Sequence, residues 1–507
     1  MSPIETAMPD PASGPVDPQR VDTSAAELKR GAFVNTLTLV ASNFRSIFTF
    51  LVARVLGPAA LGTFSVAWAT IDLLSKIGIF GLDDAITTFI ARTEAVGDKA
   101  RARTLFRLAV ALGFVQSVVT AGALSLAIRV WQHQLHLQPE VVSSLTLVLW
   151  AMPGIALFRI STGVSRGLKI MRHETYSRGL TESLVTILAF VTLIAMGLRR
   201  FGPEISAILG SSAAGAVALG LASSRFQSAP ANLQRASIFR EAQTLLHFAA
   251  PIAVYQFLNV FILRLDFIML GFFVGRAPGV TLATVGVYGV VIGLAGGLRK
   301  VNHAFNPIFA PVVAGLTAGG DQHQAAATYA RLAQWMLWML LPIAAVLTLA
   351  GEPILLIYGP AFRQGTLWLA ITAVACATDA FVGFGETVIM VQRPRLNLIN
   401  STISCAIAFA ANLWLIPRYG VLGAAIGLLI PFVVQGILRF LVLRIVFGWP
   451  TQWNNLLPPV TAAAVALGPA GLCRLLIDGI TGQLTAAVVF LAIFGTAWQY
   501  HRVRGSS

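Results

Sequence analysis

Long apolar runs recur along the chain from about residue 28, and short polar or glycine-containing segments separate them. Windows of about 19 residues indicate membrane-spanning helices. They predict 14 helices, at 31–54, 60–81, 108–128, 141–158, 180–198, 205–222, 244–263, 282–298, 332–350, 366–390, 398–416, 421–443, 456–473 and 484–500. Because the runs are continuous and not alternating, they favour helices over the strands of a membrane β-barrel.

The composition supports an all-α polytopic membrane protein. The 507 residues are 56% hydrophobic and 11% charged, against about 25% charged residues in a soluble domain. So few charges cannot cover the surfaces of the several soluble domains that this length would otherwise suggest. The composition therefore excludes a multidomain soluble protein.

Basic residues set the predicted orientation. The formal net charge is +15, which in a soluble protein would indicate a nucleic-acid partner, whereas membrane proteins collect Lys and Arg in their cytoplasmic loops. With a cytoplasmic N-terminus, 25 Lys and Arg lie on the cytoplasmic side of the predicted helices and 9 on the other. We therefore predict that both termini are cytoplasmic, and we expect no nucleic-acid partner.

Five segments follow from the pattern. Residues 1–27 are proline-rich without an apolar core, so they predict a disordered cytoplasmic tail and not a signal peptide. The other segments are an N-lobe of six helices at 28–222, a polar cytoplasmic connector at 223–243, a C-lobe of six helices at 244–446, and two further helices with the C-terminal tail at 447–507.

A weak internal repeat supports the division into halves. Gly57 and Gly275 each end an apolar helix, and the next helix then opens with Gly62–x–Phe64 or Gly286–x–Tyr288. Paired halves with a binding site between them are a common transporter plan.

Several stretches resemble polysaccharide and oligosaccharide-lipid flippases of the multidrug/oligosaccharidyl-lipid/polysaccharide exporter superfamily. They are RVLGPAALGTFSVA and IGIFGLDDAITTFIAR in the first half, GEPILLIYGPAFRQG at 351–365 and NLWLIPRYGVLGAAIG at 412–427. These motifs are turn and cap patterns that point to a fold better than to a substrate. The resemblance implies two six-helix lobes around a central cavity with alternating access, lined by helices 1, 2, 7 and 8, with two extra C-terminal helices outside the lobes.

The resemblance also implies a function. It is that of a bacterial inner-membrane flippase for oligosaccharides linked to undecaprenyl pyrophosphate, serving O-antigen, capsule or exopolysaccharide synthesis. Its partners would be the lipid-linked oligosaccharide, membrane lipids, a polysaccharide polymerase and a chain-length regulator. The sugar, the coupling ion and the oligomeric state stay open. We expect no cofactor, no metal and no catalytic residue.

Basic residues on the four supposed cavity helices are candidates for an anion path. A pyrophosphate needs cations inside the bilayer, where an uncompensated Arg costs about 2.5–3.5 kcal/mol on insertion scales. The candidates are Arg45, Lys76, Arg264 and Arg299, the last followed by Lys300. Structural alternatives exist for all four, and Arg45 could pair with Asp72 or cap a neighbouring carbonyl. Lys76 can pair with Asp72 four residues earlier, Arg299 can be an interfacial anchor, and Arg264 can reach the interface beside Asp266.

Polar and acidic residues within the apolar runs give two further sets. Glycan hydroxyls could be bound by Asn43, Tyr255, Gln256, Asn259, Asn302 and His303, although Asn and Gln also hold membrane helices together. Ion coupling could use Asp72, Asp379 and Glu386, because intramembrane carboxyls are typical of proton relays. Neutralisation of a nearby Arg is the alternative for these acids.

Two other functions compete with the flippase hypothesis. A multidrug exporter of the same superfamily would need an acidic, aromatic cavity, whereas the candidate cavity helices are basic. A membrane glycosyltransferase or polymerase would need a large loop with carboxylates or histidines. The acidic pair Asp83–Asp84 lies at the predicted cytoplasmic end of helix 2 and is interpreted there as a helix cap. The sequence therefore favours a transporter over an enzyme.

Overall fold

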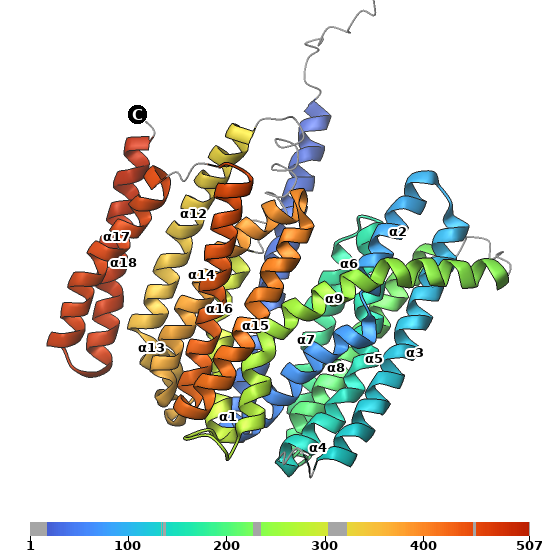
Figure 1. The fold of residues 1–507 in the computed structure, drawn as a ribbon, viewed down its shortest axis with the longest axis horizontal. Coiled ribbons are helices and arrows are strands. Elements are labelled where there is room, and N and C mark those ends of the chain that lie inside the picture. Colours follow the sequence, from blue (N-terminus) through green and yellow to red (C-terminus); the bar gives the residue numbers. More distant parts are fainter. Residues whose placement is uncertain are drawn as a thin grey trace, which may run out of the picture.

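The computed structural model describes residues 18–132, 134, 138–226, 235–302, 322–449 and 453–505, and these residues form helices and turns without a strand. Figure 1 shows two groups of helices that meet at one end of the molecule. In the described residues, 13 helices are long and apolar enough to cross a membrane. The first of them, Ser46–Ile79, contains a backbone break, so the 14 predicted helices are all represented.

Apart from the first arm of α1, the elements of the N-terminal half form the first group. They are α1 (Pro18–Ile79), α2 (Leu82–Val96), α3 (Lys99–Trp131), α4 (Pro139–Val148), η1 (Leu149–Ala151), α5 (Met152–Gly167), α6 (Arg172–Glu174), η2 (Thr175–Glu182), α7 (Ser183–Ala195), α8 (Gly202–Ser223) and η3 (Ser224–Phe226). Here α5 packs on α2, α3 and α8, and α7 packs on α8.

The second group holds most of the C-terminal half, which begins with the long helix α9. Its elements are α9 (Arg235–Phe273), α10 (Leu282–Ala295), α12 (Gln322–Leu349), α13 (Gly351–Leu356), η4 (Pro360–Gly365), α14 (Thr366–Gln392), α15 (Pro394–Tyr419), α16 (Val421–Leu441), η5 (Val442–Val446), α17 (Trp453–Leu476) and α18 (Gly479–Gly505). The pair α17 and α18 stands at one edge and packs on α12.

A glycine divides α1 into the two predicted helices. Gly57 has φ 84° and ψ 177°, and Pro58 follows it. Positive φ is strained for side chains other than glycine, and proline is well placed in the first turn of the second arm. The first arm begins at Pro18, so residues 18–27 of the predicted disordered tail are helical, and residues 1–17 lie outside the described residues.

Helical structure follows two of the predicted spans where the sequence predicted loops. The predicted loop after residue 81 forms α2, and the predicted helix 141–158 continues through α4, η1 and α5 to Gly167. Sequence windows end at the first charged residues, and both extensions begin at such residues. Asp83 and Asp84 therefore lie in the first turn of α2, where the N-cap is Gly81 and no side chain caps the helix. The interpretation of Asp83–Asp84 as a helix cap was wrong.

The two halves touch backbone to backbone where the repeated glycines lie. A Cβ on Gly62 would stand 1.8 Å from the carbonyl oxygen of Leu282, and a Cβ on Gly286 would stand 1.8 Å from that of Pro58. The contact is thus reciprocal between the second arm of α1 and α10. A third close approach lies further along, where a Cβ on Gly81 would be 2.7 Å from the carbonyl oxygen of Ala249 on α9.

Candidate functional site

The seam between the two halves carries three of the charged side chains predicted to act in transport, namely Lys76, Arg264 and Asp72. We use "seam" for the contact of α9 with the second arm of α1 and with α2, two pairs of elements that pack directly. Asp72 and Lys76 come from α1, Asp83 and Asp84 from α2, and Gln256 and Arg264 from α9. These six side chains form the ion pairs and hydrogen bonds between the halves that are described next.

Asp72 and Arg264 form an ion pair across the seam. The guanidinium Nη2 and Nε of Arg264 both lie 2.9 Å from Oδ2 of Asp72. The side chain of Arg264 is 29% exposed, so the pair is half-buried and only partly screened by solvent. Among the described residues, the ion-pair partner of Arg264 is therefore Asp72 and not Asp266.

Gln256 joins three charged side chains of the N-terminal half. Its Oε1 accepts a hydrogen bond of 2.9 Å from Nζ of Lys76. Its Nε2 donates to Asp84 at 2.7 Å and to Asp83 at 3.2 Å. In the described residues Lys76 has no carboxylate oxygen within 4.0 Å, so the predicted helix-face pair of Asp72 with Lys76 does not form. Lys76 is only 6% exposed, and a neutral amide is its direct partner.

Two arginines that the sequence placed in a cytoplasmic loop belong to the same site. Arg159 on α5 lies 3.9 Å from Asp72 and 3.7 Å from Asp83, measured between nitrogen and oxygen. Arg166, two turns later on α5, lies 3.4 Å from Asp84. Their spacing of seven residues, which puts both on one helix face, was the available signal. The predicted end of the helix at residue 158 concealed it.

A second polar cluster lies inside the C-terminal half. Nε of Arg299 is 2.7 Å from Oδ2 of Asp379, and its guanidinium lies over the ring of Phe432 at 5.1 Å. Nearby, Tyr288 donates a hydrogen bond of 2.7 Å to Asp266, which is 1% exposed. Arg299 therefore has a half-buried carboxylate partner on another helix and is not a solvent-facing anchor.

A third cluster surrounds Glu386 of α14. Its Oε1 accepts from the hydroxyl of Tyr255 at 2.6 Å, and its Oε2 accepts from Nη2 of Arg439 at 2.6 Å. Asn397 donates to Glu386 and to Tyr255 at 3.4 and 3.3 Å. Tyr255 and Gln256 are neighbours on α9, so one short segment is bonded to the C-terminal half by Tyr255 and to the N-terminal half by Gln256.

The other predicted residues are placed as follows. Asn259 lies one turn after Tyr255 on α9, and Asn302 is 9% exposed with its amide nitrogen close to Gly383. The side chains of Asn43 and Arg45 and the whole of His303 lie outside the described residues. No group of three or more metal-ligating side chains occurs in the described part of the chain.

The site at the seam has more basic than acidic side chains. Lys76, Arg159, Arg166 and Arg264 face Asp72, Asp83 and Asp84, which leaves one positive charge in surplus when all are ionised. A desolvated anion with several oxygens can replace the carboxylates as a partner of these cations. The arrangement is thus suited to binding an anion by exchange of ion-pair partners.

The comparisons with known proteins agree with this architecture. Residues 28–301 match the family described as "Polysaccharide biosynthesis protein". No curated protein matches the chain in sequence. Among solved structures, one described as "Lipid II flippase MurJ, inward closed conformation" is similar with a TM-score of 0.72 at 11% identity, covering 94% of this chain and 100% of that one.

Two other similar structures are MATE transporters. An inward-facing multidrug resistance MATE family transporter of the MOP superfamily gives a TM-score of 0.62 at 14% identity, covering 80% of this chain and 94% of that one. The Vibrio cholerae MATE transporter VcmN, as its D35N mutant, gives 0.56 at 17% identity, covering 82% and 98%. At these identities the likeness shows a shared fold.

Proposed function

The chain belongs to the family of polysaccharide biosynthesis proteins, and on that premise we propose that it is a flippase for an oligosaccharide linked to undecaprenyl pyrophosphate. It moves this lipid across the bacterial inner membrane by alternating access, to supply polysaccharide synthesis. It acts as a transporter without a catalytic residue. Both termini are cytoplasmic in this proposal, and a polysaccharide polymerase and a chain-length regulator are its protein partners.

The observation that carries the proposal is the surplus of cations at the seam. Burial of a charge is costly unless it is paired, and the cations of the seam are already held in place by carboxylates and by Gln256. A pyrophosphate that enters the seam takes over cations such as Arg264 from Asp72. The substrate therefore meets preorganised hydrogen-bond donors, and the protein does not have to move a further cation into the bilayer.

Partner exchange also gives a route to alternating access. The bonds of Gln256 and the pair of Asp72 with Arg264 hold the two halves together, and the crossing of Gly62 and Gly286 closes them at the end that carries Gly57. When the substrate replaces the carboxylates as partner of the cations, the bonds across the seam are lost. The halves are then free to change their relative angle and to rock about the site.

A multidrug exporter is the second candidate, and one observation favours it. Asp72, Asp83 and Asp84 lie in the same site. The sequence suggested a basic site, whereas the seam also contains these three acidic side chains. Three carboxylates could hold an organic cation if the arginines moved away. The two functions differ in which charges the substrate needs, and this difference is testable.

Transport by the purified protein in proteoliposomes separates the candidates. We expect flipping of a fluorescent polyprenyl-pyrophosphate oligosaccharide, and we expect Arg264→Gln to slow it at least tenfold. Asp72→Asn should retain more activity, because it frees a cation for the phosphates. Arg418→Gln is the matched control, since Arg418 is exposed and donates to the carbonyl of Trp414 on its own helix.

The reverse order would overturn the flippase proposal. If Asp72→Asn abolishes transport while Arg264→Gln transports normally, and if an organic cation is exported, the protein is a multidrug exporter. Arg45 is tested in the same assay and by complementation of a flippase-null strain. Normal polysaccharide export with Arg45→Ala would remove Arg45 from the anion path without affecting the argument for the seam.

A further inference from the structure

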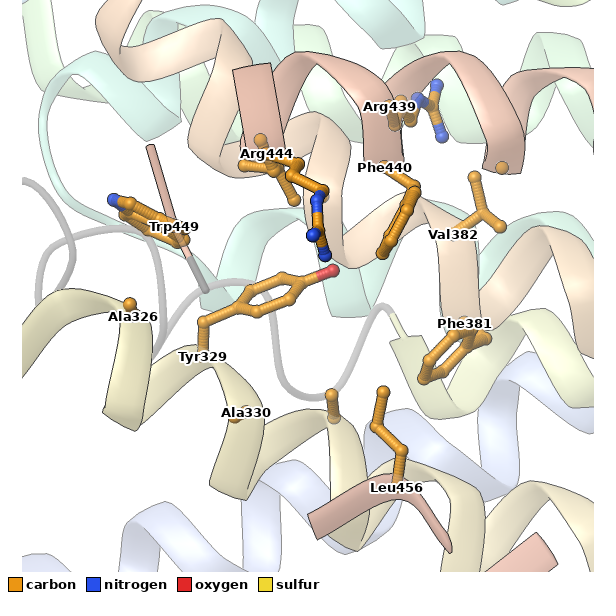
Figure 2. Close-up of a pocket in the computed structure, with 14 residues that line it drawn as sticks. Ala326, Tyr329, Ala330, Phe381, Val382, Arg439, Phe440, Arg444, Trp449 and Leu456 are labelled. Carbon is orange, nitrogen blue, oxygen red and sulfur yellow. The ribbon is translucent and has the colours of Figure 1, made fainter. Parts of the chain in front are cut away.

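Cavities away from the seam lie in both halves of the molecule. The one in the C-terminal half has a volume of about 110 Å³. Figure 2 shows that the guanidinium of Arg444 and the hydroxyl of Tyr329 point toward one another there, and Arg439 of its lining pairs with Glu386. The basic groups of that cavity are thus turned toward other groups of the protein.

The cavity of the N-terminal half has a different character. It is an open basin of about 490 Å³, formed by the turn between α5 and α6 and by η3. Its lining is Lys169, Ile170, Met171, Arg172 and Arg225. We call it the basic basin, because three of these five residues are cations and none is acidic. All three cations are exposed, and no seam side chain lines the basin.

Buried hydrogen bonds hold the turn that carries the basin. Nδ1 of His173 on α6 lies 2.9 Å from the hydroxyl of Ser165 on α5, and both side chains are buried. The hydroxyl of Ser177 donates to the carbonyl of His173 at 2.6 Å. The short helix α6, which begins with Arg172, is therefore fixed against α5.

The backbone of Lys169 is strained. Its φ is 59°, a conformation that favours glycine over residues with a side chain. The amide of Lys169 donates to the carbonyl of Arg166 at 2.9 Å, which closes the turn after α5. A glycine would make the same turn without strain, so the lysine side chain points to a role other than folding.

The cations of the basin have no acidic partner in the described part of the chain. One turn before the basin, Arg166 pairs with Asp84, whereas no carboxylate oxygen of the described residues lies within 4.0 Å of the charged nitrogens in the basin. Residues 227–234, which directly follow Arg225, contain no Asp or Glu. The three positive charges are therefore available to an anion from outside the protein.

The position of the basin fits a lipid of the surrounding bilayer. The candidate spans Pro139–Gly167 and Gly202–Phe226 end there, and Arg172–Ala195 begins there. Basic pockets between spanning helices at the level of the headgroups bind anionic lipids. Met171 in the lining is 63% exposed. A free inorganic anion would leave this apolar side chain in water, whereas a lipid would cover it.

We propose that the basic basin binds the headgroup of an anionic phospholipid of the phosphatidylglycerol type. The phosphate lies among Lys169, Arg172 and Arg225, and the first methylenes of the acyl chains cover Met171. Zwitterionic phosphatidylcholine binds less well, because the cations of the basin repel its ammonium group. This site does not depend on which substrate crosses the seam.

The test uses the purified full-length protein after removal of its native lipid. The Tm is measured with short-chain phosphatidylglycerol, with short-chain phosphatidylcholine and with inorganic phosphate, and bound lipid is counted by native mass spectrometry. We expect phosphatidylglycerol to raise the Tm and to stay bound. The double variant Arg172→Gln with Arg225→Gln should raise its Kd at least tenfold.

Lys169→Gly separates lipid binding from folding. Because glycine adopts positive φ without strain, the lipid-free variant should have the Tm of the unmodified protein or a higher one. Its Kd for phosphatidylglycerol should nevertheless rise severalfold, since one of the three cations is lost. A purely structural role of Lys169 would leave the Kd unchanged.

The control variant is Arg107→Gln, because Arg107 is exposed on α3 of the same half and does not line the basin. It should bind phosphatidylglycerol as the unmodified protein does. Equal stabilisation by phosphatidylcholine would refute the charge selectivity, and equal stabilisation by inorganic phosphate would show a simple phosphate site in place of a lipid site. Unchanged binding in both Lys169→Gly and the double variant would overturn the proposal.

Discussion

At the scale of single residues, the intramembrane arginines are held by carboxylates from other helices. Arg264, Arg299 and Arg439 pair with Asp72, Asp379 and Glu386. All three acids were predicted to couple transport to an ion, and neutralisation of an Arg was the alternative; the pairing supports the alternative as their role in this conformation. The pair of Glu386 with Arg439 is the most buried on its basic side, because Arg439 is 3% exposed.

Removal of the carboxylate in that pair is therefore expected to destabilise the protein. Glu386→Gln leaves Arg439 buried without a counter-charge, and a broken buried pair costs about 3–5 kcal/mol. Arg439→Met combined with Glu386→Gln should recover part of this loss, since the double variant leaves no unpaired charge. Thermal unfolding of the two single variants and the double variant measures the coupling. Strictly additive shifts in Tm would contradict it.

At the scale of elements, two glycines let α1 and α10 cross at backbone contact. Neither Gly62 nor Gly286 can carry a Cβ without a collision with a carbonyl oxygen of the other helix. The sequence repeat pointed to these two glycines as equivalent. Their direct contact could not be predicted, because a repeat shows which positions correspond and does not show that they meet.

Gly286→Ala is expected to push the two helices apart and to lower both stability and transport. Overpacking of a tight contact costs about 1–3 kcal/mol. Gly293→Ala is the matched control on the same helix, because a Cβ there has no atom within 4 Å. Tm and flipping rate of the two variants are compared. Wild-type values for Gly286→Ala would mean that the two helices shift easily to accommodate the methyl group and that their contact does not hold the halves together.

At the scale of the whole molecule, α9 is bonded to both halves. Gln256 reaches Lys76, Asp83 and Asp84, while Tyr255 reaches Glu386 and Asn397. In Figure 1 the two groups of helices meet at one end, which agrees with α9 linking the two halves. Separation of the halves must break the bonds of Gln256, so the seam opposes opening until a substrate competes for its charges.

Gln256→Leu is therefore expected to favour the separated state. Hydrogen–deuterium exchange should rise in α2 and in the part of α9 around Ala249, where Gly81 now packs closely, while α17 and α18 stay protected. The control is Gln116→Leu, which removes a bond to the carbonyl of Ile77 inside the N-terminal half. A rise spread evenly over the whole chain would indicate general destabilisation and would refute a local opening of the seam.

The sequence by itself determined the class of the protein, because apolar length and charge content follow directly from composition. It gave the helical membrane fold and the positions of the spanning helices, and its motifs resemble the right family. It also singled out Lys76 and Arg264, which lie where the halves meet, since an intramembrane charge is conspicuous in an apolar run. For Arg45 and Asn43, whose side chains lie outside the described residues, the predictions rest on the sequence alone.

Only the tertiary structure decided which charges meet. Arg159 and Arg166 were counted as loop residues because a hydropathy window stops at the first charge, although the helix continues while packing and partners compensate it. Partners such as Arg264 with Asp72 are 192 residues apart in the chain, and no local pattern encodes such a distance. Pairing across helices depends on how the helices cross, and that crossing is set by contacts throughout the bundle.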